Sequence, residues 1–167
     1  MPKTIFLVVA VLILSFVTSL YAGMEPFYQG AKGMSQAETA ALYEQPPAID
    51  VYKEGSKKGL LCYDQELYGL PMQVCYYFQD DKTYEIIVDF SVWESSPGQV
   101  KSLKKQVEKD LKSQMPNYRT DHMTPKEYQG KTYYDYTWVN DAVIVTLHME
   151  LSKYNDLKGH IKFLERN

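Results

Sequence analysis

The sequence has few of the residues on which catalysis most often depends. It contains only two cysteines and three histidines in 167 residues. It has no G-x-S-x-G nucleophile motif, no glycine-rich phosphate loop and no H-E-x-x-H metal motif. Long runs of basic residues are also absent, and the formal net charge is −3. We therefore predict no catalytic residues, no metal, no cofactor and no nucleic-acid partner.

The first 22 residues have the layout of a secretory signal peptide. Lys3 precedes an apolar run from Ile5 to Leu20, and Ala22 stands at the expected cleavage position. This run of about 16 residues is shorter than the roughly 20 that span a bilayer as a helix. We expect a signal peptide over residues 1–22 and a protein exported to the periplasm or the extracellular space. The alternative is an uncleaved N-terminal membrane anchor with the domain outside.

The remaining chain has the length of one domain. Residues 23–33 are aperiodic and contain glycine, which favours a linker. We expect a single α+β domain over residues 34–167.

Two segments have the signals of helices. In residues 34–45, Ser35 and Glu38 have the spacing of a capping box, which predicts a short N-terminal helix. After Ser96 and Pro97, apolar residues recur at intervals of three and four, which predicts one long amphipathic helix that ends before Pro116. The apolar residues are Val100, Leu103, Val107 and Leu111.

Alternation of apolar and polar residues predicts strands in two regions, 60–90 and 134–164. Each region divides into three strands at turn residues, with a further short edge strand at 49–53 and a loop at 117–130. The predicted fold class is α+β: an antiparallel sheet made of two three-stranded blocks, with the long amphipathic helix packed on it and the short N-terminal helix beside it.

The two cysteines have the spacing of a cross-strand pair. If Tyr68 and Gly69 form a two-residue hairpin turn, Cys62 and Cys75 are opposite each other at a pair that is not hydrogen-bonded. Side chains approach most closely at such pairs, so we predict a structural disulfide. The C-x-x-C spacing of redox and metal sites is absent.

Tyrosine is abundant, at 15 residues. Most of the tyrosines occur in strand-like runs, which favours a structural role over a binding role. Some of them nevertheless fall on the strand face away from the main apolar stripes. We predict a candidate binding face that contains Tyr77, Tyr133, Asp135 and His148.

These observations favour an exported, non-catalytic binding or accessory domain of the cell envelope or extracellular space. The expected partner is another exported protein or a small ligand, with membrane contact only if the N-terminal segment is not cleaved. One alternative is a small exported hydrolase that uses His148, Glu150 and Asp121, with His160 as a further metal ligand. A second alternative is a carbohydrate-binding module that stacks sugars on exposed tyrosines.

Overall fold

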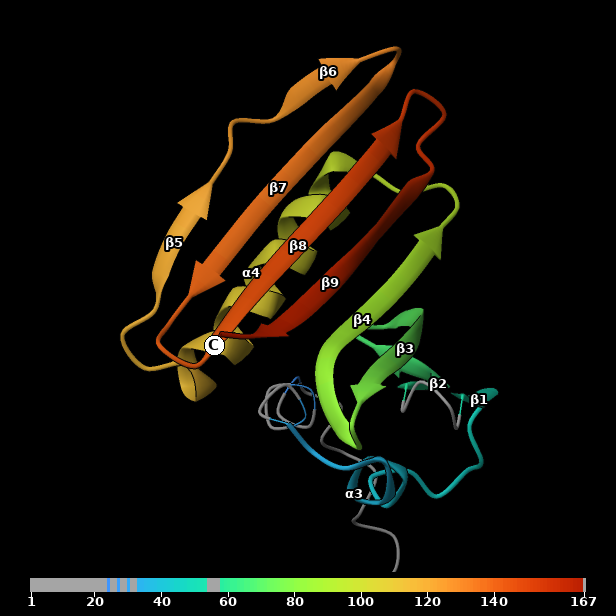
Figure 1. Ribbon diagram of the computed structural model, residues 1–167. Coiled ribbons are helices and arrows are strands. Elements are labelled where there is room, and N and C mark those ends of the chain that lie inside the picture. Colours follow the sequence, from blue (N-terminus) through green and yellow to red (C-terminus); the bar gives the residue numbers. More distant parts are fainter. Residues whose placement is uncertain (1–23, 25–26, 28–29, 31–32, 54–57, 167) are drawn as a thin grey trace, which may run out of the picture.

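The computed structural model describes residues 24, 27, 30, 33–53 and 58–166, and these form one continuous antiparallel sheet with two helices (Figure 1). The predicted signal peptide lies outside the described residues, as does most of the predicted linker. Within that linker, Met24 and Phe27 are buried in the core, where the Phe27 ring lies 6.0 Å from the Phe163 ring.

The short helix comes first, four strands follow it, and the longer helix separates these from five further strands. The helices are α3 (Gln36–Ala40) and α4 (Pro97–Gln114). The strands are β1 (Ile49–Lys53), β2 (Lys58–Leu67), β3 (Leu70–Gln79), β4 (Lys82–Val92), β5 (Arg119–His122), β6 (Lys126–Tyr128), β7 (Lys131–Val139), β8 (Val143–Ser152) and β9 (Leu157–Glu165).

The strand order explains how the chain builds one sheet. Strands β1 to β4 form a meander, and α4 then crosses behind the sheet to the far edge (Figure 1). From that edge the chain returns through β5, β7, β8 and β9, so that β9 pairs with β4; β6 also pairs with β7. The β4–β9 pairing runs from Glu85 opposite Leu164 to Val92 opposite Leu157 and joins the two halves of the sheet.

The predicted fold class is wrong. Of the described residues, 53% lie in strands and 19% in helices, so the protein is mainly an antiparallel β structure. The two three-stranded blocks do not exist as separate units, because an isolated block would leave β4 and β9 with unpaired backbone groups at their edges. Pairing these two strands satisfies those groups and merges the blocks into one sheet, which β1, β5 and β6 extend to nine strands.

The long amphipathic helix is also a wrong prediction. Only four of the eighteen residues of α4 are buried, in a line of one residue every three or four positions. An amphipathic helix has a broader stripe, with three to four apolar residues in every two turns. The predicted start is confirmed, because Ser96 caps the helix and forms a capping box with Gln99. At α3 the predicted capping box of Ser35 and Glu38 is likewise present, although the helix ends at Ala40.

The predicted loop at 117–130 is partly sheet. Strand β5 pairs with β7 from Arg119 opposite Val139, and the short β6 pairs with the other end of β7. All seven residues of these two strands are exposed. An exposed edge strand has no apolar alternation, which explains why the sequence pattern does not reveal it.

The predicted disulfide is confirmed. Cys62 and Cys75 are bonded and directly opposite each other on β2 and β3. The hairpin turn is the predicted one: Tyr68 has φ 57° and Gly69 has φ 72°, the left-handed values of a two-residue type I′ turn.

The core lies between the sheet and α4 and extends under α3. It includes the four buried residues of α4 and the largest buried ring, that of Trp138. Several tyrosines are structural: Tyr43 stacks on Tyr63 at 3.7 Å, and its hydroxyl is 2.7 Å from that of Tyr76. No helix in the described part of the chain has the length and apolar character needed to cross a bilayer.

Candidate functional site

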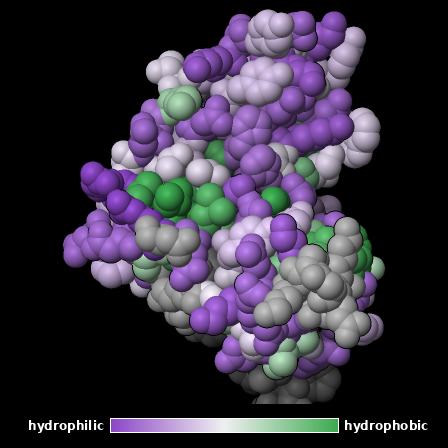
Figure 2. Space-filling model, in the orientation of Figure 1, coloured by the Kyte–Doolittle hydropathy of each residue, from purple (hydrophilic) through white to green (hydrophobic). Residues whose placement is uncertain are grey.

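The face of β4, β9, β8 and β7 that points away from α4 is the candidate functional surface, and we call it the open face (Figure 1). Burial alternates along these strands. On β8, for example, Val143, Val145 and Leu147 are buried toward α4, whereas Thr146 and His148 point to the open face and are half-buried. Figure 2 views the open face and shows that it is mainly hydrophilic, with a hydrophobic patch over the lower ends of β7, β8 and β9 and smaller hydrophobic areas elsewhere.

A row of ionisable side chains crosses the open face. Asp89 on β4 is opposite His160 on β9, His160 is opposite His148 on β8, and His148 is opposite Asp135 on β7. We call these four residues the Asp–His row. Because neighbouring strands lie about 4.8 Å apart, the row extends over about 14 Å. The register of three strand pairs therefore places two histidines side by side between two carboxylates.

His148 is the best-connected member of the row. Its Nδ1 atom lies 2.6 Å from Oδ1 of Asp135, and its ring lies 6.2 Å from that of Tyr133. The side chains of His148 and Asp135 are 36% and 40% exposed, so a partner molecule can reach both. The second ring nitrogen of His148 is not used by this contact and can bind a hydrogen-bonding group of a partner.

His160 is in a different electrostatic position. Its ring centroid lies 5.4 Å from that of His148. Burial lowers the pKa of His160, the charge of His148 lowers it further, and the carboxylates of Asp89 and Asp135 only partly oppose this. The neutral form of His160 is therefore favoured beside His148.

Ion pairs flank the Asp–His row on both sides. Lys131 lies 2.6 Å from Glu150, and this hydrogen bond raises the pKa of the lysine. Lys162 forms an ion pair with Glu85. Charges that are already paired contribute little net attraction to a partner.

The apolar patch of the open face has a defined composition. Val139, Ile144 and Leu164 are opposite one another on β7, β8 and β9, and all three are half-buried. They lie four residues along β8 from His148 and on the same face. The open face thus combines an apolar row with a polar row about 14 Å away, at 3.4 Å per residue.

Three of the four predicted binding-face residues come together. Tyr133, Asp135 and His148 are neighbours on β7 and β8. Tyr77 has the same orientation but lies on β3, four strands and about 19 Å from β7. Its ring is instead 6.4 Å from that of Tyr84, and burial raises its pKa. Tyr77 therefore belongs to a separate part of the face.

The residues of the hydrolase alternative do not converge. Asp121 lies on β5, two strands from His148, and is opposite Thr137. Its neighbour His122 points to the other face, where its ring contacts Tyr136 at 5.1 Å and Trp138 at 5.3 Å. Within the described residues, no three His, Cys, Asp or Glu side chains are grouped so that they could hold a metal ion.

Sequence reasoning missed the role of Asp89. The hairpin of β8 and β9 aligns His148 with His160, and this register can be counted from the turn between them. Asp89 joins them only through the pairing of β4 with β9, which are separated in sequence by α4 and four strands. No local signal indicates that pairing.

Comparisons of this chain with protein-family models, with curated proteins and with solved structures find no match. The open face itself is therefore the basis of the functional assignment.

Proposed function

We propose that this protein is an exported, non-catalytic binding or accessory domain that recognises another exported protein through the open face. The observation that carries the proposal is the composition of that face. Within the described residues, neither helix covers it, yet it contains the half-buried apolar row of Val139, Ile144 and Leu164 and, about 14 Å away along β8, the accessible Asp–His row. Protein interfaces combine these two features, with apolar contacts for affinity and polar contacts for specificity.

Export is supported by the disulfide and by the N-terminal sequence. Bonded cysteines persist in oxidising compartments and are rare in the cytosol. We propose that the chain is cleaved after Ala22 and that the mature protein begins at Gly23. Intact-mass measurement of the protein isolated from its own envelope or medium tests this proposal, and a species that retains Lys3 would favour the membrane-anchored alternative.

The partner proposal is tested with matched variants of the tagged full-length protein, expressed in its native host. Tyr133→Ala and His148→Ala remove side chains from the open face, and Lys105→Ala removes an exposed side chain from α4 as a control. We expect the wild-type protein and the control to retain the same co-purifying exported protein and the two open-face variants to lose it. Urea denaturation should place all variants within about 0.5 kcal/mol of the wild type, as is usual for surface substitutions.

Two results would contradict the proposal. One is retention of the same partner by all variants. The other is a loss of about 2 kcal/mol or more in the free energy of unfolding of Tyr133→Ala, which would show that this tyrosine packs as core residues do.

A further inference from the structure

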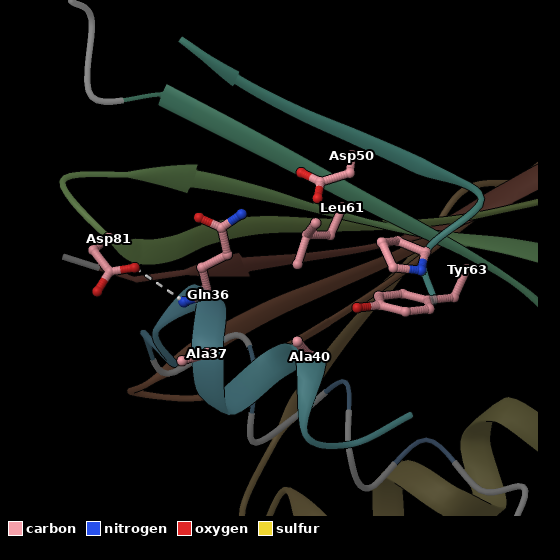
Figure 3. Close-up of a pocket in the computed structure, with 8 residues that line it drawn as sticks. Gln36, Ala37, Ala40, Asp50, Leu61, Tyr63 and Asp81 are labelled. Carbon is pink, nitrogen blue, oxygen red and sulfur yellow. Dashed lines mark hydrogen bonds between the residues drawn. The ribbon is translucent and has the colours of Figure 1, made fainter. Parts of the chain in front are cut away.

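A cavity of about 380 Å³ lies on the other side of the sheet, between α3 and strands β1 and β2 (Figure 3). Its volume is within the range of small-ligand sites. The lining residues come from α3, the turn before β1, the two strands and the turn before β4: Gln36, Ala37, Ala40, Pro47, Asp50, Leu61, Tyr63 and Asp81. Leu61 and Tyr63 point away from the open face, so the cavity is independent of the proposed partner surface.

Among the described residues, the hydroxyl of Tyr63 is a buried polar group without a hydrogen-bond partner. The residue is 1% exposed, and its hydroxyl oxygen forms no hydrogen bond with any described residue. Tyr43 stacks on the ring but directs its own hydroxyl to Tyr76. Figure 3 shows that the Tyr63 hydroxyl points into the cavity. Leaving a buried hydroxyl unpaired costs about 1–3 kcal/mol, which a polar ligand atom would recover.

The charged groups at the cavity are negative. Asp50 is exposed on β1 opposite Leu61, and its carboxylate points toward the same space as the Tyr63 hydroxyl (Figure 3). Burial raises the pKa of Tyr63, and the charge of Asp50 raises it further. At the other end Asp81 accepts a hydrogen bond of 3.1 Å from the backbone N–H of Gln36. None of the eight lining residues is basic.

The apolar part of the cavity is small and aliphatic. It is lined by Leu61, Ala37, Ala40 and Pro47. A short aliphatic chain can therefore lie against these residues while its head group reaches Asp50 and Tyr63.

We propose that this cavity binds the head group of a small organic cation, an alkylammonium or a guanidinium. The N–H groups of the cation donate to the carboxylate of Asp50 and to the hydroxyl oxygen of Tyr63, and its aliphatic part packs on Leu61. Charge-assisted hydrogen bonds of this kind are stronger than neutral ones. The same chemistry is present in a free amine and in a lysine or arginine side chain of a partner protein.

The proposal is tested by NMR titration of the disulfide-bonded full chain with three probes that share one aliphatic body: n-butylammonium, n-butanol and butyrate. We expect saturable shifts of the amide signals of Ala37, Ala40 and Leu61 with n-butylammonium. Binding of n-butanol should be at least about fivefold weaker because it lacks the charge, and butyrate should not bind. Absence of saturable shifts with n-butylammonium, or equal binding of n-butanol, would overturn the proposal.

Matched variants assign the head-group contacts. Asp50→Asn should weaken n-butylammonium binding about tenfold, the effect of losing one hydrogen bond to a charged group. Asp141→Asn changes an exposed carboxylate in the β7–β8 turn and should leave binding unchanged. Equal affinity of Asp50→Asn and the wild type would overturn the assignment.

Tyr63→Phe separates a ligand contact from a structural one. Removing an unpaired hydroxyl should leave the melting temperature unchanged or raise it, while binding weakens several-fold. Unchanged binding would overturn the role of the hydroxyl.

Titration with Nα-acetyl-lysine methylamide distinguishes the two sources of the cation. Matching shifts would indicate a side chain of a partner protein, and binding of n-butylammonium alone would indicate a free amine.

Discussion

The Nδ1 atom of His148 lies 2.6 Å from Oδ1 of Asp135 on the neighbouring strand, and this contact anchors one end of the Asp–His row. On its other side His148 faces the ring of His160, whose centroid is 5.4 Å away. One histidine therefore has a carboxylate partner, whereas the other is packed against a second imidazole. From this asymmetry we predict that protonation of His160 affects the protein differently from protonation of an exposed histidine.

His160 should make the stability of the protein depend on pH. Its pKa is lower in the folded protein than the ordinary value of 6.5 because of burial and of the charge of His148, partly opposed by Asp89 and Asp135; Lys162 also lowers it. The unfolded chain therefore binds the proton more readily, and stability is lost as the pH falls through 6.5 toward the folded-state pKa. We expect urea unfolding to show a larger loss between about pH 7.5 and about pH 5.5 in the wild type than in His160→Gln. Parallel pH profiles would contradict the prediction.

The disulfide should contribute measurably to stability. Cys62 and Cys75 are 13 positions apart in the sequence, and cross-linking a loop of this size stabilises a fold by about 3 kcal/mol. The double variant Cys62→Ala, Cys75→Ala should lose about this amount in urea denaturation, and reduction of the wild type should have the same effect. Thiol labelling of the unreduced, denatured wild type should find no free cysteine.

Gly159→Ala should be strongly destabilising although the glycine is in a strand. A Cβ atom at this position would lie against the backbone carbonyl oxygen of His148 and 2.7 Å from Cζ of Phe90. A backbone atom cannot move aside as a side chain can, so we expect a loss of about 2 kcal/mol or more. Gly98→Ala is the control, because its nearest neighbour, Ser96 Oγ, would be at an ordinary 3.5 Å. Similar melting temperatures of the two variants would show that β8 and β9 separate easily.

Leu103→Asp should unfold the protein. Leu103 is 2% exposed, and an unpaired charge there costs several kcal/mol of the roughly 5 to 15 that hold a domain together. Lys104 is not a neutral control, because it pairs with Glu108 and lies over the ring of Tyr136. Lys105 is exposed, and Lys105→Asp should leave the circular dichroism melting curve almost unchanged. Cooperative melting of Leu103→Asp at the wild-type temperature would show that the side chain of Leu103 is not buried in the core.

Local sequence signals determined the features that depend on neighbouring residues. The turn at Tyr68 and Gly69 sets the register that places Cys62 opposite Cys75, and a two-residue turn leaves no alternative register. The capping boxes at Ser35 and Ser96 are equally local. The orientation of Tyr133, Asp135 and His148 follows from strand alternation in the same way, because successive side chains point to opposite faces.

Only the tertiary structure decided the rest. The pairing of β4 with β9 unites the two halves of the sheet and brings Asp89 to His160, and it joins strands that are far apart in the chain. Strands β5 and β6 are exposed and have no apolar alternation, so their backbone hydrogen bonds to β7 define them. The cavity lined by Asp50, Leu61 and Tyr63 likewise depends on where α3 meets β1 and β2. Such contacts are chosen by satisfying backbone groups and burying surface across the whole molecule, which a local residue pattern does not encode.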